Sequence, residues 1–280
     1  MDQKTANEML VPVTKSAALR YILETVEHGY YHYCFNVLAP EKVLRFAAKM
    51  ESYDVLATRG ARAYAKEKGR ASARLVLFPL DDARRGQAPG EISEDTQLQT
   101  YRPLGLWVYY LLATDGTGVV HEKERLRDAR VEPRLPWQRY YPGRGGLQPQ
   151  YDLVARPVRT RDQRTIYRWT WRMSPFMFGL MAGWVNDGAT RVRSSSEKNP
   201  AYLLQALDGL RKLPGFKGVR EQARHIVLGA DIPKMGGLDT HIGGYTDKAQ
   251  PVFLPGRTLG AMLATAPVAA AAVPTVVKSS

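Results

Sequence analysis

The stretch TIYRWTWRM at residues 165–173 constrains the fold most, because it alternates between two kinds of side chain. One set is Tyr167, Trp169, Trp171 and Met173, and the other is Ile166, Arg168, Thr170 and Arg172. Successive side chains of a strand point to opposite faces, so this period predicts one aromatic face and one face with basic and hydroxyl groups. YDLVARPV at 151–158 is the expected partner, and RTRDQR is the turn between them. The pair predicts an antiparallel hairpin.

The N-terminal part alternates between helical and strand patterns. Apolar residues at helical spacing predict a helix over 16–27, and the Tyr, Phe and Val of 30–38 predict a strand. Pro40 is expected to open a second helix, because its fixed φ suits the first turn. A basic helix over 57–68 and a strand over 71–80 complete the series.

The middle of the chain is expected to contain one buried strand and less regular structure. LGLWVYYLLAT at 104–114 predicts a buried strand that ends in a DGTG turn. Residues 119–130 predict a short strand running into a charged helix. Residues 136–150, rich in Pro, Gly, Arg and aromatic residues, predict a loop.

The last third is expected to be helical. Ser174 and Pro175 suit the N-cap and the first helical position, and helices are predicted from there to about Ala230. The sum is an α+β fold, an antiparallel sheet compatible with ferredoxin-like repeats, with helices packed on it. Three parts are expected: an N-terminal α/β part at 1–103, Arg-rich strands followed by helices at 104–235, and an irregular C-terminal tail at 236–280.

Cysteine usage and the termini indicate the compartment. Cys34 is the single cysteine of the 280 residues, so an internal disulfide framework is excluded. MDQKTANEMLVPV has no basic-then-apolar signal pattern. The apolar stretch 259–277 is rich in Ala, Thr and Pro and lacks aromatic anchors, unlike a membrane span. We therefore expect a cytoplasmic protein with no membrane partner.

Charge is the strongest global signal. The formal net charge is +13, and residues 120–172 alone contain thirteen Arg and Lys against six carboxylates. Such a balance favours a polyanionic partner, and arginine suits bidentate phosphate contacts and stacking on bases. We therefore predict a nucleic-acid partner, with RNA favoured over DNA; the alternative is an Arg-rich solvated surface. The arginines expected to bind nucleic acid are Arg125, Arg127, Arg130, Arg139, Arg144, Arg156, Arg159, Arg161, Arg164, Arg168 and Arg172.

HGYYHYCFNVLA at residues 28–39 is the candidate catalytic stretch. In a strand, His32, Cys34 and Asn36 share one face, and the opposite face is expected to be core. His32 could act as a general base, or it could only hydrogen-bond at the rim of the sheet. HExxH, phosphate-loop and dinucleotide-binding motifs are absent, so neither a metal site nor a cofactor is expected.

A strand, a helix opening at Pro40 and a return strand, in a basic chain with histidines near its N-terminus, resemble the repeats of Cas6-like CRISPR RNA endonucleases, particularly the type IV, plasmid-borne members. The resemblance covers 16–173 by element order. It implies metal-independent cleavage, in which a 2′-hydroxyl attacks the adjacent phosphate. The residues that the resemblance nominates for catalysis or phosphate stabilisation are His28, Tyr31, His32 and Arg45.

Three functional hypotheses stay open on the sequence. The first is an RNA-binding protein that acts as a processing endoribonuclease and stays in a ribonucleoprotein complex with other subunits. The second is a non-enzymatic DNA-binding protein of plasmid or mobile-element maintenance, replication or transfer. A helix-turn-helix would favour this second hypothesis, and the two-helix unit expected at 203–227, with Gly in its turn, keeps it open. The third is a structural subunit of a ribonucleoprotein.

Overall fold

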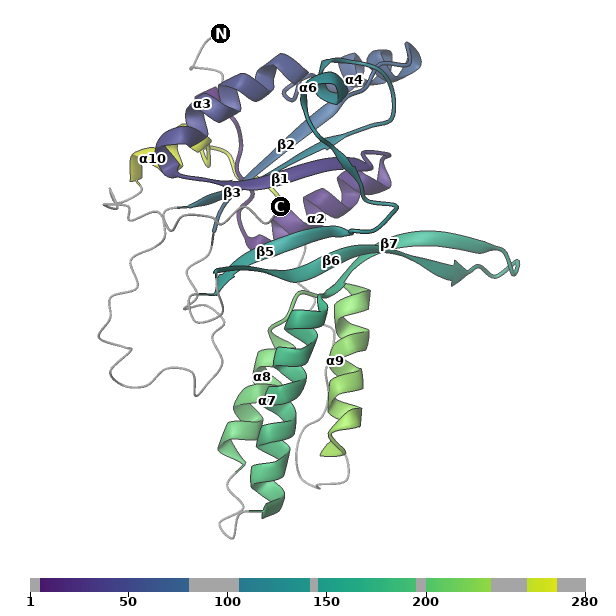
Figure 1. The fold of residues 1–280 in the computed structure, drawn as a ribbon, viewed down its shortest axis with the longest axis vertical. Coiled ribbons are helices and arrows are strands. Elements are labelled where there is room, and N and C mark those ends of the chain that lie inside the picture. The colour runs from purple at the N-terminus through teal and green to yellow at the C-terminus, as the bar shows by residue number, and fades with distance from the viewer. Residues whose placement is uncertain (1–5, 81–105, 142–145, 195–199, 233–250, 266–280) are drawn as a thin grey trace.

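The chain has the α+β fold that its sequence predicts, with two antiparallel sheets and packed helices (Figure 1). The computed structural model describes residues 6–80, 106–141, 146–194, 200–232 and 251–265. In this part of the chain no helix is long and apolar enough to cross a membrane.

The first sheet has the strand order β2-β3-β1-β4, and each neighbouring pair is antiparallel. Its strands are β1 (His32–Leu38), β2 (Ala73–Pro79), β3 (Trp107–Ala113) and β4 (Arg127–Asp128). The helix α3 (Pro40–Met50) follows β1, and α6 (Val119–Lys123) follows β3. This β-α-β-β-α-β order is that of a ferredoxin-like unit. β3 lies beyond the expected boundary at 103 and pairs with both β1 and β2. The first sheet therefore contains strands from the two parts expected at 1–103 and 104–235.

The predicted order of helix, strand, helix, helix and strand at the N-terminus is confirmed. α2 (Lys15–Glu27) begins after Thr14, whose hydroxyl accepts a hydrogen bond from the Ala17 amide at 3.1 Å. After α3 come the 3-10 turn Glu51–Tyr53 and α4 (Arg59–Glu67). The chain leaves α4 through Gly69, whose φ of +67° suits glycine.

The second sheet is the three-stranded meander β5-β6-β7. Its strands are β5 (Leu135–Tyr141), β6 (Gly146–Arg159) and β7 (Thr165–Met173), so the predicted hairpin is confirmed. The prediction of a loop over 136–150 is wrong, because this region contributes β5 and the start of β6. β5 is an edge strand, where Pro136 is tolerated, and a register shift at Trp137/Gln138 accommodates Pro149 opposite Gln138.

The order predicted for residues 119–130 is also wrong, because the helix comes first. α6 follows Gly118, whose φ is +146°, and β4 comes after it. β4 consists of Arg127 and Asp128, which pair with Tyr33 and His32. Its strand conformation comes from the edge of β1 rather than from its own residues, and a local pattern does not reveal such a partner.

The helical prediction for the last third is confirmed by α7 (Pro175–Ser194), α8 (Ala201–Arg211) and α9 (Lys217–Gly229). Ser174 caps α7, since its hydroxyl accepts from the Met177 amide at 3.1 Å. The buried Arg220 donates to the Leu210 and Arg211 carbonyl oxygens at the end of α8.

Two apolar cores hold these layers together. α2 lies between the two sheets (Figure 1), and the larger core joins it to the inner face of the first sheet, the second sheet and α7–α9. The indole Nε1 of Trp171 donates to the Leu19 carbonyl at 2.8 Å inside this core. The smaller core lies under α3, and α10 (Leu259–Thr265) packs there, within the tail expected to be irregular.

Close packing of α9 on β7 gives a stability prediction. A Cβ at Gly218 would lie 2.6 Å from the Trp171 carbonyl oxygen, which belongs to the buried backbone. We expect Gly218→Ala to lower the free energy of unfolding by about 1–3 kcal/mol, since the helix has to shift. Gly179→Ala is the matched control: a Cβ there meets nothing within 4 Å, so a gain of about 0.5–1 kcal/mol is expected. Urea unfolding of both variants measures the difference, and equal effects would contradict the packing argument.

Candidate nucleic-acid interface

A polar cluster lies at one end of the first sheet. His32 begins β1 and stands opposite Ala113 of β3 and Asp128 of β4. The turn after β3 therefore brings Asp115 to this end. The His32 Nε2 lies 2.7 Å from Asp115 Oδ1, and the guanidinium of Arg130 donates to the same oxygen at 3.0 Å.

Arg130 joins two carboxylates in this cluster. It also donates to Asp128, from Nε at 2.9 Å and from a terminal nitrogen at 2.7 Å. Hydrogen bonds from His32 and Arg130 lower the pKa of Asp115. Burial acts to raise the pKa of Asp128, but the hydrogen bonds from Arg130 outweigh it and the pKa is lowered. Both carboxylates are therefore ionised at neutral pH.

His121 of α6 completes the cluster. Its ring centroid lies 4.9 Å from that of His32, edge to face, and its Nε2 lies 2.9 Å from the Thr114 carbonyl oxygen. A carbonyl only accepts, so Nε2 of His121 carries the hydrogen and Nδ1 is the acceptor of the neutral ring. The ionised Asp115 fixes His32 in the same way. The cluster thus presents two histidines whose tautomers are set, a suitable arrangement for proton transfer.

A stacked path leads from this cluster to the second sheet. The Arg130 guanidinium lies 4.6 Å from the centroid of the Tyr31 ring, and Tyr31 stacks on Trp169 of β7 at 6.1 Å. Tyr167 shares the Trp169 face of the strand and is 70% exposed. Aromatic and guanidinium groups therefore extend from the cluster onto the hairpin.

The far part of the hairpin, residues 155–169, is called the β6–β7 arm here. The β5 pairing on β6 ends at Leu153, so only β6 and β7 pair with each other in the arm. Figure 1 shows these ends of β6 and β7 extending away from the helices and the first sheet. None of the arm residues is buried. At its base the arm contacts the rest of the protein through Trp169 and Arg156, and beyond these residues its side chains are open to a partner.

The structure divides the predicted phosphate-binding arginines into groups. The exposed arginines on the arm are Arg159, Arg161, Arg164 and Arg168. Arg164 lies 3.1 Å from Asp162, and Arg156 pairs with Glu221 of α9. Arg125, Arg127 and Arg172 are exposed outside the arm, while Arg130 belongs to the cluster. Arg144 lies outside the described residues.

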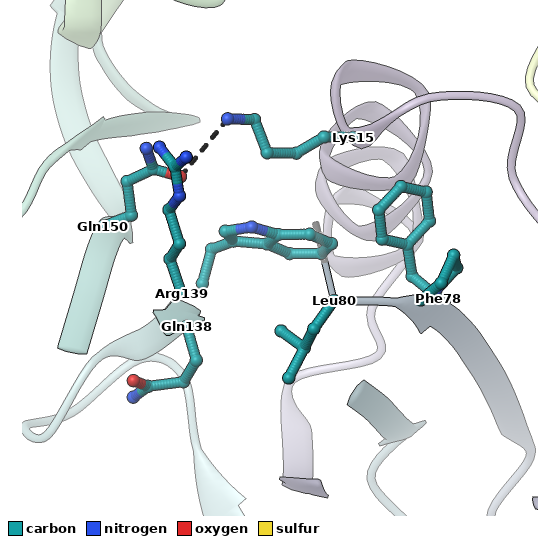
Figure 2. Close-up of a pocket in the computed structure, with 8 residues that line it drawn as sticks. Lys15, Phe78, Leu80, Gln138, Arg139 and Gln150 are labelled. Atoms are coloured by element: carbon teal, nitrogen blue, oxygen red, sulfur yellow. Dashed lines mark hydrogen bonds between the residues drawn. The ribbon is translucent and has the colours of Figure 1, made fainter. Parts of the chain in front are cut away.

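Arg139 lies in a pocket near the opposite end of β6 (Figure 2). It is 8% exposed, and its guanidinium lies 5.5 Å from the centroid of the Tyr141 ring. Lys15 donates to the Gln150 side-chain oxygen at 3.3 Å beside it, and Phe78, Leu80 and Trp137 form the apolar wall. Arg139 is therefore part of an internal polar seam between α2 and the second sheet, apart from the arm.

The four residues nominated for catalysis do not come together. Tyr31 and His32 belong to the cluster and its stacked path. His28 is exposed at the end of α2, where its Nδ1 lies 2.5 Å from the Glu24 carbonyl oxygen. Arg45 is on the exposed side of α3. In the described part of the chain, no contact links His28 or Arg45 to the cluster.

The face of β1 that carries His32 is also less polar than expected. Cys34, two residues on, packs with Tyr109 against the smaller core under α3. Burial, with the Glu124 carboxylate next in effect, raises the pKa of the Cys34 thiol to about 12. Glu124 itself accepts from the Tyr53 hydroxyl at 2.6 Å and from Lys49 Nζ at 3.2 Å. Cys34 thus belongs to this core, whereas Asn36, two residues further along the same face, is exposed.

Sequence reasoning did not find Asp115 and His121. The sequence predicts Asp115 only as part of a DGTG turn, and His121 has no motif spacing to other histidines. The register of β1 with β3 brings both to His32, and this register depends on contacts far apart in the sequence. Among the described residues, no group of three or more His, Cys, Asp or Glu side chains is placed to hold a metal ion.

Comparison of the chain with protein-family profiles, with curated proteins and with solved structures finds no match.

The lowered pKa of Asp115 predicts a pH dependence of stability. The ionised form of Asp115 is favoured in the folded state. Its contribution to the free energy of unfolding is therefore complete above pH 3.8, the ordinary pKa of an aspartate, and is lost as the pH falls through the lower pKa of the folded state. We expect Asp115→Asn to be less stable than wild type at pH 7. The difference in stability between wild type and this variant should become smaller in acid, where the Asp115 carboxylate of wild type is protonated and loses its charge. Thermal unfolding between pH 7 and pH 2 tests this; a difference in melting temperature that stays constant over this range would contradict it.

Proposed function

We propose that the chain is a basic RNA-binding protein that holds single-stranded RNA on the β6–β7 arm and the adjoining stacked path. The observation that carries the proposal is the arm itself. It is a two-stranded ribbon without a buried residue, and it carries four exposed arginines and the exposed Tyr167.

The chemistry of the arm fits single-stranded RNA. Guanidinium groups bind phosphates, and aromatic rings stack on unpaired bases whatever their identity. Tyr167, Trp169 and Tyr31 supply rings in sequence, and Arg130 lies over the last of them. An RNA strand bound on the arm would thus pass toward His32.

The cluster supports a second step, cleavage of the bound RNA. One histidine would take the proton of a 2′-hydroxyl through Nδ1, and the 2′-oxygen would attack the adjacent phosphorus. The 5′-oxygen would leave with a proton from the other, protonated histidine. The products would be a 2′,3′-cyclic phosphate and a 5′-hydroxyl. The resemblance to CRISPR RNA endonucleases implies the same reaction, and it stays a prediction.

A second candidate is duplex DNA binding, which the shape of the arm favours. The major groove of B-DNA admits a two-stranded β-ribbon. The helix-turn-helix route of this hypothesis has less support: the N-terminal residues of a recognition helix contact bases, but Gly218, Val219 and Arg220 at the start of α9 are buried. A DNA-binding role would therefore use the arm as well.

Charge removal on the arm tests RNA binding. We expect Arg161→Gln/Arg168→Gln to weaken binding to single-stranded RNA by about tenfold at moderate salt. The slope of log affinity against log salt should fall by about 1.4, since each lost phosphate contact removes about 0.7. Arg193→Gln/Arg224→Gln is the matched control, with the same charge change at exposed positions on α7 and α9. Fluorescence anisotropy over a salt series measures both.

Three probes of one sequence distinguish the candidates: single-stranded RNA, single-stranded DNA and duplex DNA. Preference for the RNA, lost in the arm variant, supports the proposal. Tightest binding to the duplex would favour the DNA candidate instead. Absence of binding to all three at low salt would contradict both.

Substitution of His32 tests cleavage. If the cluster is catalytic, His32→Ala should lower the single-turnover cleavage rate in EDTA by about 10²–10⁴, while binding stays within about twofold. His28→Ala is the matched control, since His28 lies outside the cluster and should leave the rate unchanged. A 2′-deoxy substitution at the cut site should abolish the reaction. Cleavage that survives His32→Ala, or that accepts the 2′-deoxy substrate, would refute this mechanism.

A further inference from the structure

α4 is a helix without a buried residue. It has nine residues, begins after Thr58, whose hydroxyl accepts from the Ala61 amide at 3.3 Å, and ends at Glu67. Isolated helices of fewer than about 12 residues are marginal in water, and most helices gain their stability by packing an apolar face. A helix that packs no such face leaves its whole outer surface to solvent or to a partner.

The charged side chains exposed on α4 and at its end are mostly cationic. They are Arg59, Lys66, Lys68 and Arg70, with Glu67 as the carboxylate among them. Within the described residues, none of these four cations is in an ion pair. Tyr64 is 54% exposed, and Lys68 Nζ lies 5.6 Å from the centroid of its ring. Cations with an exposed aromatic ring are the same combination that the arm presents.

The end of α4 adjoins the turn that carries Asp115. Arg70 forms a β-bridge with Thr117, and the Ala71 amide donates to the Thr117 carbonyl at 2.8 Å. Gly116 lies so close to this segment that a Cβ would be 2.8 Å from the Gly69 carbonyl oxygen. The cluster therefore has α4 on one side and the stacked path to the arm on the other. Figure 1 shows α4 and the arm at the same end of the first sheet.

We propose that α4 is a second RNA-binding element, which holds the phosphates of the strand that the arm binds. The inference rests on the proposed function. Asp115, in the turn beside the end of α4, accepts from Arg130, and the stacked path continues from Arg130 to Trp169. One RNA strand can therefore pass from α4 over His32 to the arm. The occupant is a phosphate backbone, because the helix offers exposed cations in no described ion pair beside the exposed Tyr64 ring.

Lys66→Gln/Lys68→Gln tests α4, with Arg193→Gln/Arg224→Gln again as the control of equal charge. On an RNA of about 12 nucleotides, within the usual range of single-strand sites, the α4 variant should lower the salt slope by about 1.4. The control should leave the slope unchanged. Hydrogen exchange gives a second readout: α4 amides should exchange rapidly in the free protein and slow down when this RNA is bound.

The outcomes separate the two proposals. If the arm variant weakens binding while the α4 variant behaves as the control and α4 amides gain no protection, α4 is not an RNA contact and the proposed function stands. If neither variant differs from the control, the proposed function itself fails. A loss in both variants, with protection of α4, supports a strand that spans the cluster.

Discussion

The burial of Trp171 against α2 is the contact on which the rest of the arrangement depends. Its indole Nε1 reaches the Leu19 carbonyl, and its own carbonyl oxygen lies against Gly218 of α9. One residue therefore fixes the second sheet to α2 on one side and to the helices on the other. Because α2 also packs on the first sheet, this contact sets the direction in which β6 and β7 leave the body. It therefore also sets how Trp169, two residues away, meets Tyr31.

The alternation that predicts β7 serves two purposes along one strand. Near the body, Trp171 and Met173 are core residues, whereas Trp169 is half-buried and Tyr167 is exposed. The strand continues past the point where β5 and the helices stop covering it. Since the pattern does not change there, sequence alone predicts the hairpin and its two faces but not where burial ends. That limit follows from the length of β5, a segment whose composition predicts a loop.

Local patterns predicted the elements whose signal lies within a few residues, such as the Ser174 cap and the 165–173 strand. Local patterns failed where the conformation of a segment depends on a partner that is distant in the sequence. β4 is a strand only through its pairing with β1, and the cluster combines residues from β1, the turn after β3, α6 and the segment after β4. His32 could be nominated from its own strand, but Asp115 and His121 required the register of β1 with β3.

Counting arginines also overstates what a basic segment offers to a polyanion. Arg130 is compensated by two carboxylates, Arg156 by Glu221, and Arg139 is buried beside Tyr141. Exposed cations in no described ion pair, among them Arg161 and Arg168 of the arm, flank the cluster on the arm and on α4, and those of α4 lie outside the Arg-rich segment. A polyanion held at these two places would be positioned over the cluster between them, where Asp115 fixes His32 and the Thr114 carbonyl fixes His121. Binding and proton transfer would then depend on different residues, and substitutions can separate the two.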